Sequence, residues 1–305
     1  MPARNKTFLN ALLIAACVSS FSLRATESTN NATPVARIPL ELRHGAALVR
    51  ARANGSQTLT FKLDTGFGVT TIHPELVESL GLKRAGSLTI TGIAGQEKAA
   101  WFSGATFEIG DFTYSPRRVA MIPSDAQPRR RGHDGILGAG FFRRFVVELD
   151  PTERTMTLHD PEQFHYAGHG EIIPLQFRRD TPTVEATIRL PGREPLRARY
   201  EIDSGCDGGL CLGHAFVKTN RLDELPGRNH TGSRTGVGGS VETNVVRLPQ
   251  FQLGSQKLTH VAANFFREGS PVDADLAGHI GLGVLRHFKV IFDYSRRQMI
   301  LEPLK

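Results

Sequence analysis

The stretches Leu63-Asp64-Thr65-Gly66 and Ile202-Asp203-Ser204-Gly205 decide the fold of this chain. Each follows a segment in which apolar and polar residues alternate, which predicts a strand that runs directly into a turn. A single Asp-Thr-Gly is most often an ordinary turn, because Asp and Gly both suit turn positions. Two such tripeptides at matching places in a repeated chain indicate a shared role for Asp64 and Asp203.

Further pairs of segments show that the chain repeats itself. Ile38-Pro39-Leu40-Glu41-Leu42-Arg43 matches Ile173-Pro174-Leu175-Gln176-Phe177-Arg178 at an offset of 135 residues, and the two tripeptides are offset by 139. Residues 91–95 match 235–239, and residues 137–158 match 280–301. Because the order is the same and the offset nearly constant, the chain contains two copies of one fold.

The repeat also predicts how the chain is divided. We expect the two copies at residues 36–162 and 163–305, joined by a linker near residues 161–170, where Pro and Gly are frequent and no apolar period exists. A flexible segment at residues 26–35 would precede the first copy.

Within each copy the local signals are those of β structure. Two strand-like segments flank Asn54-Gly55, which is the strongest short signal of a hairpin, and the same arrangement surrounds Pro191-Gly192. Only residues 74–80 and 214–219 are expected to be helical. The sequence therefore predicts an all-β protein of two similar lobes with few short helices.

The composition excludes several classes of protein. With 305 residues, 40% apolar and 22% charged, the chain is neither disordered, collagenous nor a polytopic membrane protein. The formal net charge of +7 is spread along the chain, apart from the run Pro128-Arg129-Arg130-Arg131. No stripe of interleaved aromatic residues accompanies this run, so we interpret it as a loop tip and expect no nucleic-acid partner.

The amino terminus has the features of an export signal. Arg4 and Lys6 precede an apolar run at residues 8–18, which is shorter than the roughly 20 helical residues needed to span a bilayer. Ile14-Ala15-Ala16-Cys17 resembles a bacterial lipobox, in which Cys17 becomes lipidated and residues 18–33 form a tether. Cleavage after Ala25 is the alternative. Both predict a protein of the periplasm or cell envelope, and only the lipobox predicts membrane contact, through a lipid anchor on Cys17.

The cysteines fit an exported protein. Once Cys17 is lipidated or removed, Cys206 and Cys211 remain as an even pair in an oxidising compartment. The sequence is compatible with a local disulfide and with two buried thiols.

Together the motifs resemble the pepsin and retropepsin family of aspartic proteases. Phe61-Lys62-Leu63-Asp64-Thr65-Gly66 looks like the active-site strand and turn, and Asp134-Gly135-Ile136-Leu137-Gly138 and His279-Ile280-Gly281 are similar to the apolar segment beneath each turn. The resemblance covers both copies and is closer to retropepsin-like lobes, because the lobes are short and alike in plan. It implies a bilobal fold of two homologous β-barrel-like lobes. It also implies two hairpin flaps, which contain Gly92, Ile93, Ala94, Gly95, Gly236, Val237, Gly238 and Gly239.

The same resemblance implies an activity. Asp64 and Asp203 would form a pair of carboxyls that activates a water molecule for hydrolysis of a peptide bond, with no metal or other cofactor. Thr65 and Ser204 would support the pair through hydrogen bonds, and Gly66 and Gly205 would leave room beside the carboxyls. The chain departs from the family at Phe67 and Cys206, where a small residue is usual.

Two classes of function follow from this pattern. The first is an exported aspartic endopeptidase, which we expect to be a monomer that acts on a peptide or protein substrate. The second is a non-catalytic envelope protein that keeps the bilobal form to bind peptides or to scaffold a partner. Retention of both aspartates and both neighbouring hydroxyls favours the enzyme.

Overall fold

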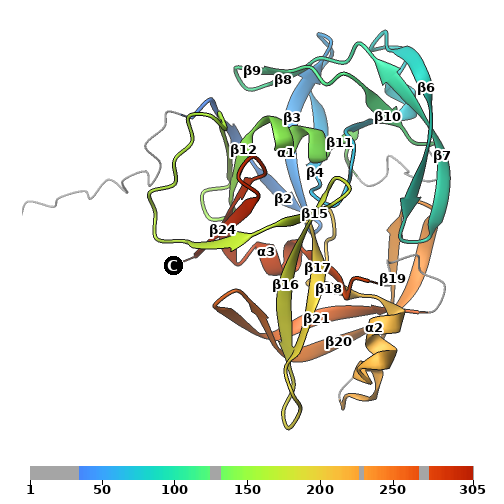
Figure 1. Ribbon diagram of the computed structural model, residues 1–305. Helices are drawn as coiled ribbons and strands as arrows, with labels where there is room; N and C mark the ends of the chain where they lie inside the picture. Colours follow the sequence, from blue (N-terminus) through green and yellow to red (C-terminus); the bar gives the residue numbers. More distant parts are fainter. Residues whose placement is uncertain (1–33, 124–131, 227–229, 268–274, 305) are drawn as a thin grey trace, which may run out of the picture.

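The structure is a computed structural model that describes residues 34–123, 132–226, 230–267 and 275–304. These residues are mainly β-strands with few short helices (Figure 1), so the predicted fold class is confirmed. The export signal, Cys17 and Arg129 to Arg131 lie outside the described residues. Within the described part, no helix is long and apolar enough to cross a membrane.

A six-stranded sheet contains strands from both halves of the chain. Its order is β1, β13, β12, β23, β24 and β14. The strand bounds are β1 (Ala36–Pro39), β13 (Thr155–His159), β12 (Val146–Asp150), β23 (Phe288–Asp293), β24 (Gln298–Pro303) and β14 (Glu171–Pro174). The first three strands come from the first half and the last three from the second, so this sheet joins the halves through the β12–β23 pair.

The register of β12 and β23 reveals an internal twofold axis. Glu148 pairs with Ile291, and the flanking pairs are Val147 with Phe292 and Leu149 with Val290. In the repeat, residues 147, 148 and 149 are equivalent to residues 290, 291 and 292, so Glu148 pairs with its own equivalent, Ile291. The axis therefore passes between Glu148 and Ile291, and it relates the two halves.

The first half forms a ten-stranded sheet in the order β6, β7, β10, β5, β11, β4, β3, β8 and β9, with β2 paired to β3. The strands are β2 (Glu41–Arg43), β3 (Ala46–Ala53), β4 (Leu59–Leu63), β5 (Thr71–Ile72), β6 (Lys83–Gly92), β7 (Gly95–Ser103), β8 (Phe107–Ile109), β9 (Phe112–Tyr114), β10 (Val119–Met121) and β11 (Gly135–Leu137). The apolar strand β11 runs parallel to β4, next to the end that carries Asp64.

The second half forms an eight-stranded sheet in the order β15, β16, β17, β22, β18, β21, β20 and β19. The strands are β15 (Gln176–Arg178), β16 (Thr181–Arg189), β17 (Leu196–Asp203), β18 (Leu210–Leu212), β19 (His230–Gly236), β20 (Gly239–Leu253), β21 (Gln256–Phe266) and β22 (Gly278–Gly281). An additional pairing of β16 with β20 closes the sheet on itself, as in a barrel. β22 runs parallel to β17, as β11 does to β4.

The described helices agree only in part with the prediction. Helix α2 (His214–Thr219) lies where it was expected, but the segment predicted at residues 74–80 forms only a 3₁₀ turn, η1 (Pro74–Leu76), followed by non-helical turns. Helices α1 (Ala139–Arg144) and α3 (Leu282–Leu285) were not predicted. With four to six residues each, they are too short to display the 3.6-residue period on which a prediction depends.

One cluster of buried apolar side chains includes residues of both halves, such as Phe61, Phe141, Tyr200 and Phe292. Phe61 on β4 is fully buried and packs edge to face against Phe107, with 5.2 Å between ring centroids. Burying a side chain of this size stabilises the fold by about 1.5–3 kcal/mol. This packing fixes the position of β4, the strand that leads directly into Asp64.

Candidate active site

Asp64 and Asp203 come together where β4 and β17 end. A Cβ atom added to Gly66 would lie 2.7 Å from Asp203 Oδ1, and one added to Gly205 would overlap the carboxyl group of Asp64. Each carboxyl therefore lies against the glycine of the other half, and only a residue without a side chain fits there. The two tripeptides that the sequence singled out thus form a single site.

Thr65 and Ser204 bind the two turns to each other. Thr65 N donates to Ser204 Oγ at 3.0 Å, and Thr65 Oγ1 donates to the carbonyl of Ile202 at 2.8 Å. Reciprocally, Ser204 N donates to Thr65 Oγ1 at 2.9 Å, and Ser204 Oγ donates to the carbonyl of Leu63 at 3.1 Å. Because both side chains are fully buried, these four bonds satisfy groups that water cannot reach.

The two carboxyls differ in acidity. Burial raises the pKa of Asp64 to about 6, with Lys62 opposing this rise and Asp203 adding to it. Burial alone would also raise the pKa of Asp203, but the hydrogen bond and charge of His279 and the charge of Lys62 bring it below its ordinary value. Asp203 Oδ1 also accepts the backbone N–H of Gly205 at 2.9 Å and of Cys206 at 3.1 Å. Asp64 therefore retains its proton to a higher pH than Asp203 does.

Three ionisable residues at the site were not singled out from the sequence. Lys62 Nζ lies 2.9 Å from Asp64 Oδ2, and His279 Nδ1 lies 3.2 Å from Asp203 Oδ2. Glu201 accepts a hydrogen bond from Thr181 Oγ1 at 3.1 Å, and burial raises its pKa to about 7. A signal for two of them was present, because Lys62 and Glu201 stand two residues before the aspartates and thus on the same strand face.

Two hairpins meet over the site. The tips of β6–β7 and β19–β20 contact each other where Ala94 N donates to the carbonyl of Val237 at 3.2 Å. A Cβ atom on Gly236 would lie 2.7 Å from Ile93 Cγ1, so the glycine permits this close approach. In Figure 1 the β6–β7 hairpin reaches from the first half to the orange hairpin of the second. The expected flap residues are thus at the two hairpin tips.

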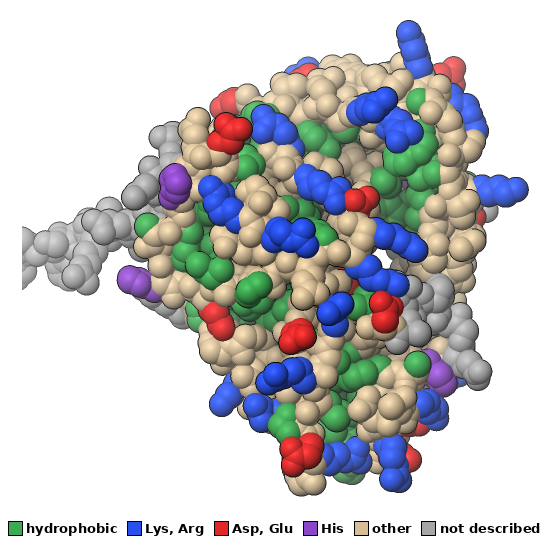
Figure 2. All heavy atoms as spheres, viewed as in Figure 1, with side chains coloured by type: hydrophobic (Ala, Val, Ile, Leu, Met, Phe, Trp, Pro, Cys, Tyr) green, Lys and Arg blue, Asp and Glu red, His purple; other side chains and the backbone are tan. Residues whose placement is uncertain are grey.

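A cavity of about 380 Å³ lies between the carboxyls and the hairpin tips. Its walls come from both halves and include Asp64, Asp203, Ile93 and Val237. Along its edge, Arg234 pairs with Asp207 at 2.6 Å. Figure 2 shows basic side chains spread over the viewed face and not gathered in one patch.

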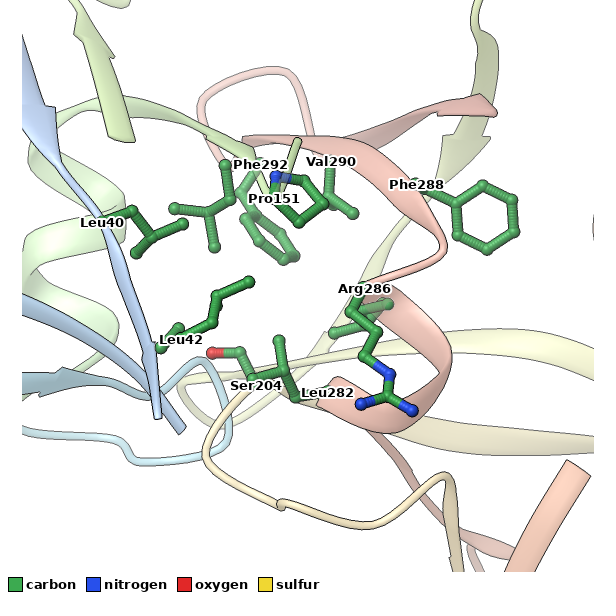
Figure 3. A pocket seen from close by; sticks show the side chains of 12 residues that line it. Leu40, Leu42, Pro151, Ser204, Leu282, Arg286, Phe288, Val290 and Phe292 are labelled. Carbon is green, nitrogen blue, oxygen red and sulfur yellow. The ribbon is translucent and has the colours of Figure 1, made fainter. Parts of the chain in front are cut away.

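A second cavity is small and apolar. It has a volume of about 20 Å³ and is bounded by Ser204 and by apolar side chains of both halves, among them Leu40, Leu282 and Phe292 (Figure 3). This is room for about one water molecule and too little for a peptide. The 380 Å³ cavity, which Asp64 and Asp203 line, is therefore the candidate for substrate binding.

Cys206 and Cys211 are free thiols whose Sγ atoms lie 3.0 Å apart, and both line the 380 Å³ cavity. A disulfide bond has an S–S length near 2.05 Å, so a small movement would join them. The structure describes two thiols, and the disulfide that the sequence left open as the alternative stays a prediction. Among the described residues, no group of three or more His, Cys, Asp or Glu side chains is arranged to hold a metal ion.

Phe67, at a position where the family usually has a small residue, packs against other side chains near the site. It is partly buried and packs against a small apolar cluster that contains Ala99, Ile122 and Val237. Since Val237 belongs to the hairpin tip of the second half, Phe67 links the turn after Asp64 to the opposite flap.

The comparisons with known proteins agree with this geometry. Residues 49–141 match the aspartyl protease family. No curated protein is a significant match to the sequence. Among solved structures, the aspartic proteinase from Irpex lacteus superposes with a TM-score of 0.58 at 14% sequence identity, covering 88% of this chain and 97% of that one.

The protein thus has the bilobal fold of the aspartic proteinases. The match of residues 49–141 to the aspartyl protease family and this shared fold confirm the resemblance seen in the sequence.

Proposed function

We propose that this protein is an aspartic endopeptidase that hydrolyses peptide bonds with a water molecule held between Asp64 and Asp203. The observation that carries the proposal is the pairing of the buried Asp64 carboxyl with the half-buried Asp203 carboxyl, one from each half, each lying against the glycine of the other. Two carboxyls in such a position share one proton at acid pH, because two adjacent negative charges are costly.

The different acidities of Asp64 and Asp203 indicate which carboxyl acts as the base and which as the acid. Ionised Asp203 takes a proton from the water as its oxygen attacks the peptide carbonyl carbon, and protonated Asp64 donates a hydrogen bond to the carbonyl oxygen as negative charge develops there. The C–N bond then breaks while the amine receives a proton from Asp203. The products are a new carboxyl terminus and a new amino terminus, and both aspartates return to their starting states.

The hairpins suggest how a peptide is bound. An extended chain in the 380 Å³ cavity would lie beneath the tips that contain Ile93 and Val237, and strand-like hydrogen bonds to β6–β7 and β19–β20 would align it. Because the two tips touch, both hairpins would have to separate before a folded protein could enter, as lids do in other enzymes.

The decisive experiment measures cleavage of a diverse peptide library at several pH values, with and without a statine-type inhibitor of aspartic proteases. Asp64→Asn and Asp203→Asn should each abolish cleavage, while circular dichroism shows an unchanged fold. Full activity in either variant would contradict the mechanism. Tight, inhibitor-sensitive peptide binding without any cleavage would instead favour the non-catalytic peptide-binding protein.

We further propose that the enzyme is exported and acts as a monomer in the periplasm or cell envelope. The apolar run at residues 8–18 and the lipobox-like sequence that ends at Cys17 support the first part. Mass spectrometry of the mature amino terminus would distinguish lipidated Cys17 from cleavage after Ala25. Light scattering with an active-site titration would test the second part, since a monomer gives one site per chain mass.

A further inference from the structure

The twofold symmetry breaks at one pair of neighbouring positions beside the aspartates. On β4 and β11, Lys62 pairs with Ile136, and at the equivalent place on β17 and β22, Glu201 pairs with His279. The halves are alike in backbone at this point but carry different charges. Since residues two apart on a strand share a face, Lys62 and Glu201 lie on the same side as the carboxyls.

Each cation holds one carboxyl. The Lys62 ammonium contacts Asp64 at 2.9 Å and donates to the carbonyl of Gly205 at 3.1 Å, so it connects the first aspartate to the turn of the second half. His279 contacts Asp203 at 3.2 Å, with Glu201 directly beside it in the sheet. The side chains of Lys62 and His279 are each 15% exposed, so water screens these contacts little.

The donors are distributed unequally. Asp203 accepts hydrogen bonds from the backbone N–H groups of Gly205 and Cys206 and lies beside His279, whereas Asp64 lies beside the Lys62 ammonium. Several donors aimed at one carboxyl favour its ionised form. In a symmetric pair either carboxyl could serve as acid or as base; here their surroundings differ.

We propose that Lys62 and His279 are positioning residues of the proposed peptide hydrolysis: each holds one carboxyl, and together they keep Asp203 as the base and Asp64 as the acid. The inference rests on the proposed function. The inference adds that two charged side chains, neither of which touches the scissile bond, control the pH range in which the enzyme is active.

Other ionisable groups face the pair but do not alter this assignment. Burial tends to lower the pKa of His279, but its hydrogen bond to Asp203 and the charges of Glu201 and Asp203 raise it to about 9. His279 is therefore a cation throughout the acid range in which the carboxyls titrate. The remaining charged or ionisable residues along the cavity are Arg178, Arg179, Asp180, Cys206, Asp207, Cys211 and Arg234.

The test is the pH dependence of kcat/KM, which reports the ionisation of the free enzyme. Lys62→Met removes a cation that lowers the pKa of Asp64, so the alkaline limb should move upward by roughly one pH unit or more. His279→Ile, which copies the equivalent Ile136, and the milder His279→Gln remove the partner that lowers the pKa of Asp203. In both His279 variants the acid limb of the pH profile should move to higher pH.

Two variants serve as matched controls. Lys62→Arg keeps the positive charge and should leave the alkaline limb in place, and Ile136→Val changes the equivalent position without a charge and should leave both limbs in place. If Lys62→Met and His279→Ile lower kcat/KM without moving either limb, the two residues have only a structural role and the inference is wrong. If the wild-type protein shows no cleavage that depends on Asp64, the proposed function itself fails.

A second measurement does not depend on activity. In a nuclear magnetic resonance titration of histidine-labelled protein, the signal that disappears in His279→Gln belongs to His279 among the 11 histidines. We expect its midpoint near pH 9 in the wild-type protein and a lower midpoint in Asp203→Asn, which removes the anionic partner. An ordinary midpoint that Asp203→Asn does not change would overturn the inference.

Discussion

Thr65 and Ser204 each exchange hydrogen bonds across the boundary between the halves, and both are fully buried. Thr65→Ala removes the hydroxyl that accepts from Ser204 N and donates to the carbonyl of Ile202. Since a buried donor then lacks a partner, we expect the free energy of unfolding to fall by about 2 kcal/mol or more. Urea unfolding measures this loss, and Thr65→Ser, which keeps the hydroxyl, is the control. Equal stability of Thr65→Ala and wild type would mean that these bonds contribute nothing.

His279 should also make stability depend on pH. Its pKa is raised from 6.5 to about 9 in the folded protein, so the folded state binds this proton more tightly than the unfolded state does. The resulting stability is fully present below pH 6.5 and is lost as the pH rises toward 9, in total of the order of 3 kcal/mol.

Urea unfolding of wild type and His279→Gln across this range measures the effect. The difference in unfolding free energy between the two proteins should shrink as the pH rises from 6.5 to 9. A difference that stays constant over that window would contradict the prediction.

The paired hairpins β6–β7 and β19–β20 offer a test of gating. An ideal Cβ atom on Gly236 lies 3.8 Å from Ile93 Cβ, which matches the mean Cβ separation of a disulfide. In Ile93→Cys with Gly236→Cys, oxidation should join the tips and block cleavage of protein substrates, and reduction should restore it. Each single variant, treated with the same oxidant and reductant, controls for effects on Cys206 and Cys211. Unimpaired cleavage by the oxidised double variant, with the crosslink verified by mass, would show that the tips need not separate.

The six-stranded sheet and the shared apolar core suggest that the two halves unfold together. Trp101 is the single tryptophan and lies on β7 in the first half, so its fluorescence reports that half alone, whereas far-ultraviolet circular dichroism reports strands of both. We expect coincident urea transitions from the two probes, because β12–β23 pairing and the core cluster cross the boundary. Separate transitions would show that each half unfolds independently.

Lys289 makes one of the bonds across that boundary. Its ammonium on β23 contacts Glu148 on β12 at 3.0 Å, and together with the hydrogen bond from His159 it brings the pKa of Glu148 below its ordinary value although burial would raise it. The pair lies beside the twofold axis, so charge complementarity reinforces the backbone pairing between the halves.

The sequence by itself determined the duplication, the all-β class and the two aspartates with their Thr, Ser and Gly neighbours. These features depend on local properties, namely the alternation of strands, the chemistry of turns and the order of motifs along the chain. Short helices such as α1 and α3 escaped prediction because a single turn has no period, and residues 74–80 were overpredicted because a Pro start does not ensure continuation.

Only the tertiary structure decided how the two motifs face each other and which charges accompany them. The contact of Lys62 with Gly205 joins residues 143 positions apart in the chain, and that of His279 with Asp203 joins residues 76 apart. The first contact depends on the twofold axis and the second on the register of β17 and β22, and no local pattern encodes either. The acidity of Asp64 and Asp203 follows from burial, from these partners and from the other carboxyl, so it arises only in the folded protein.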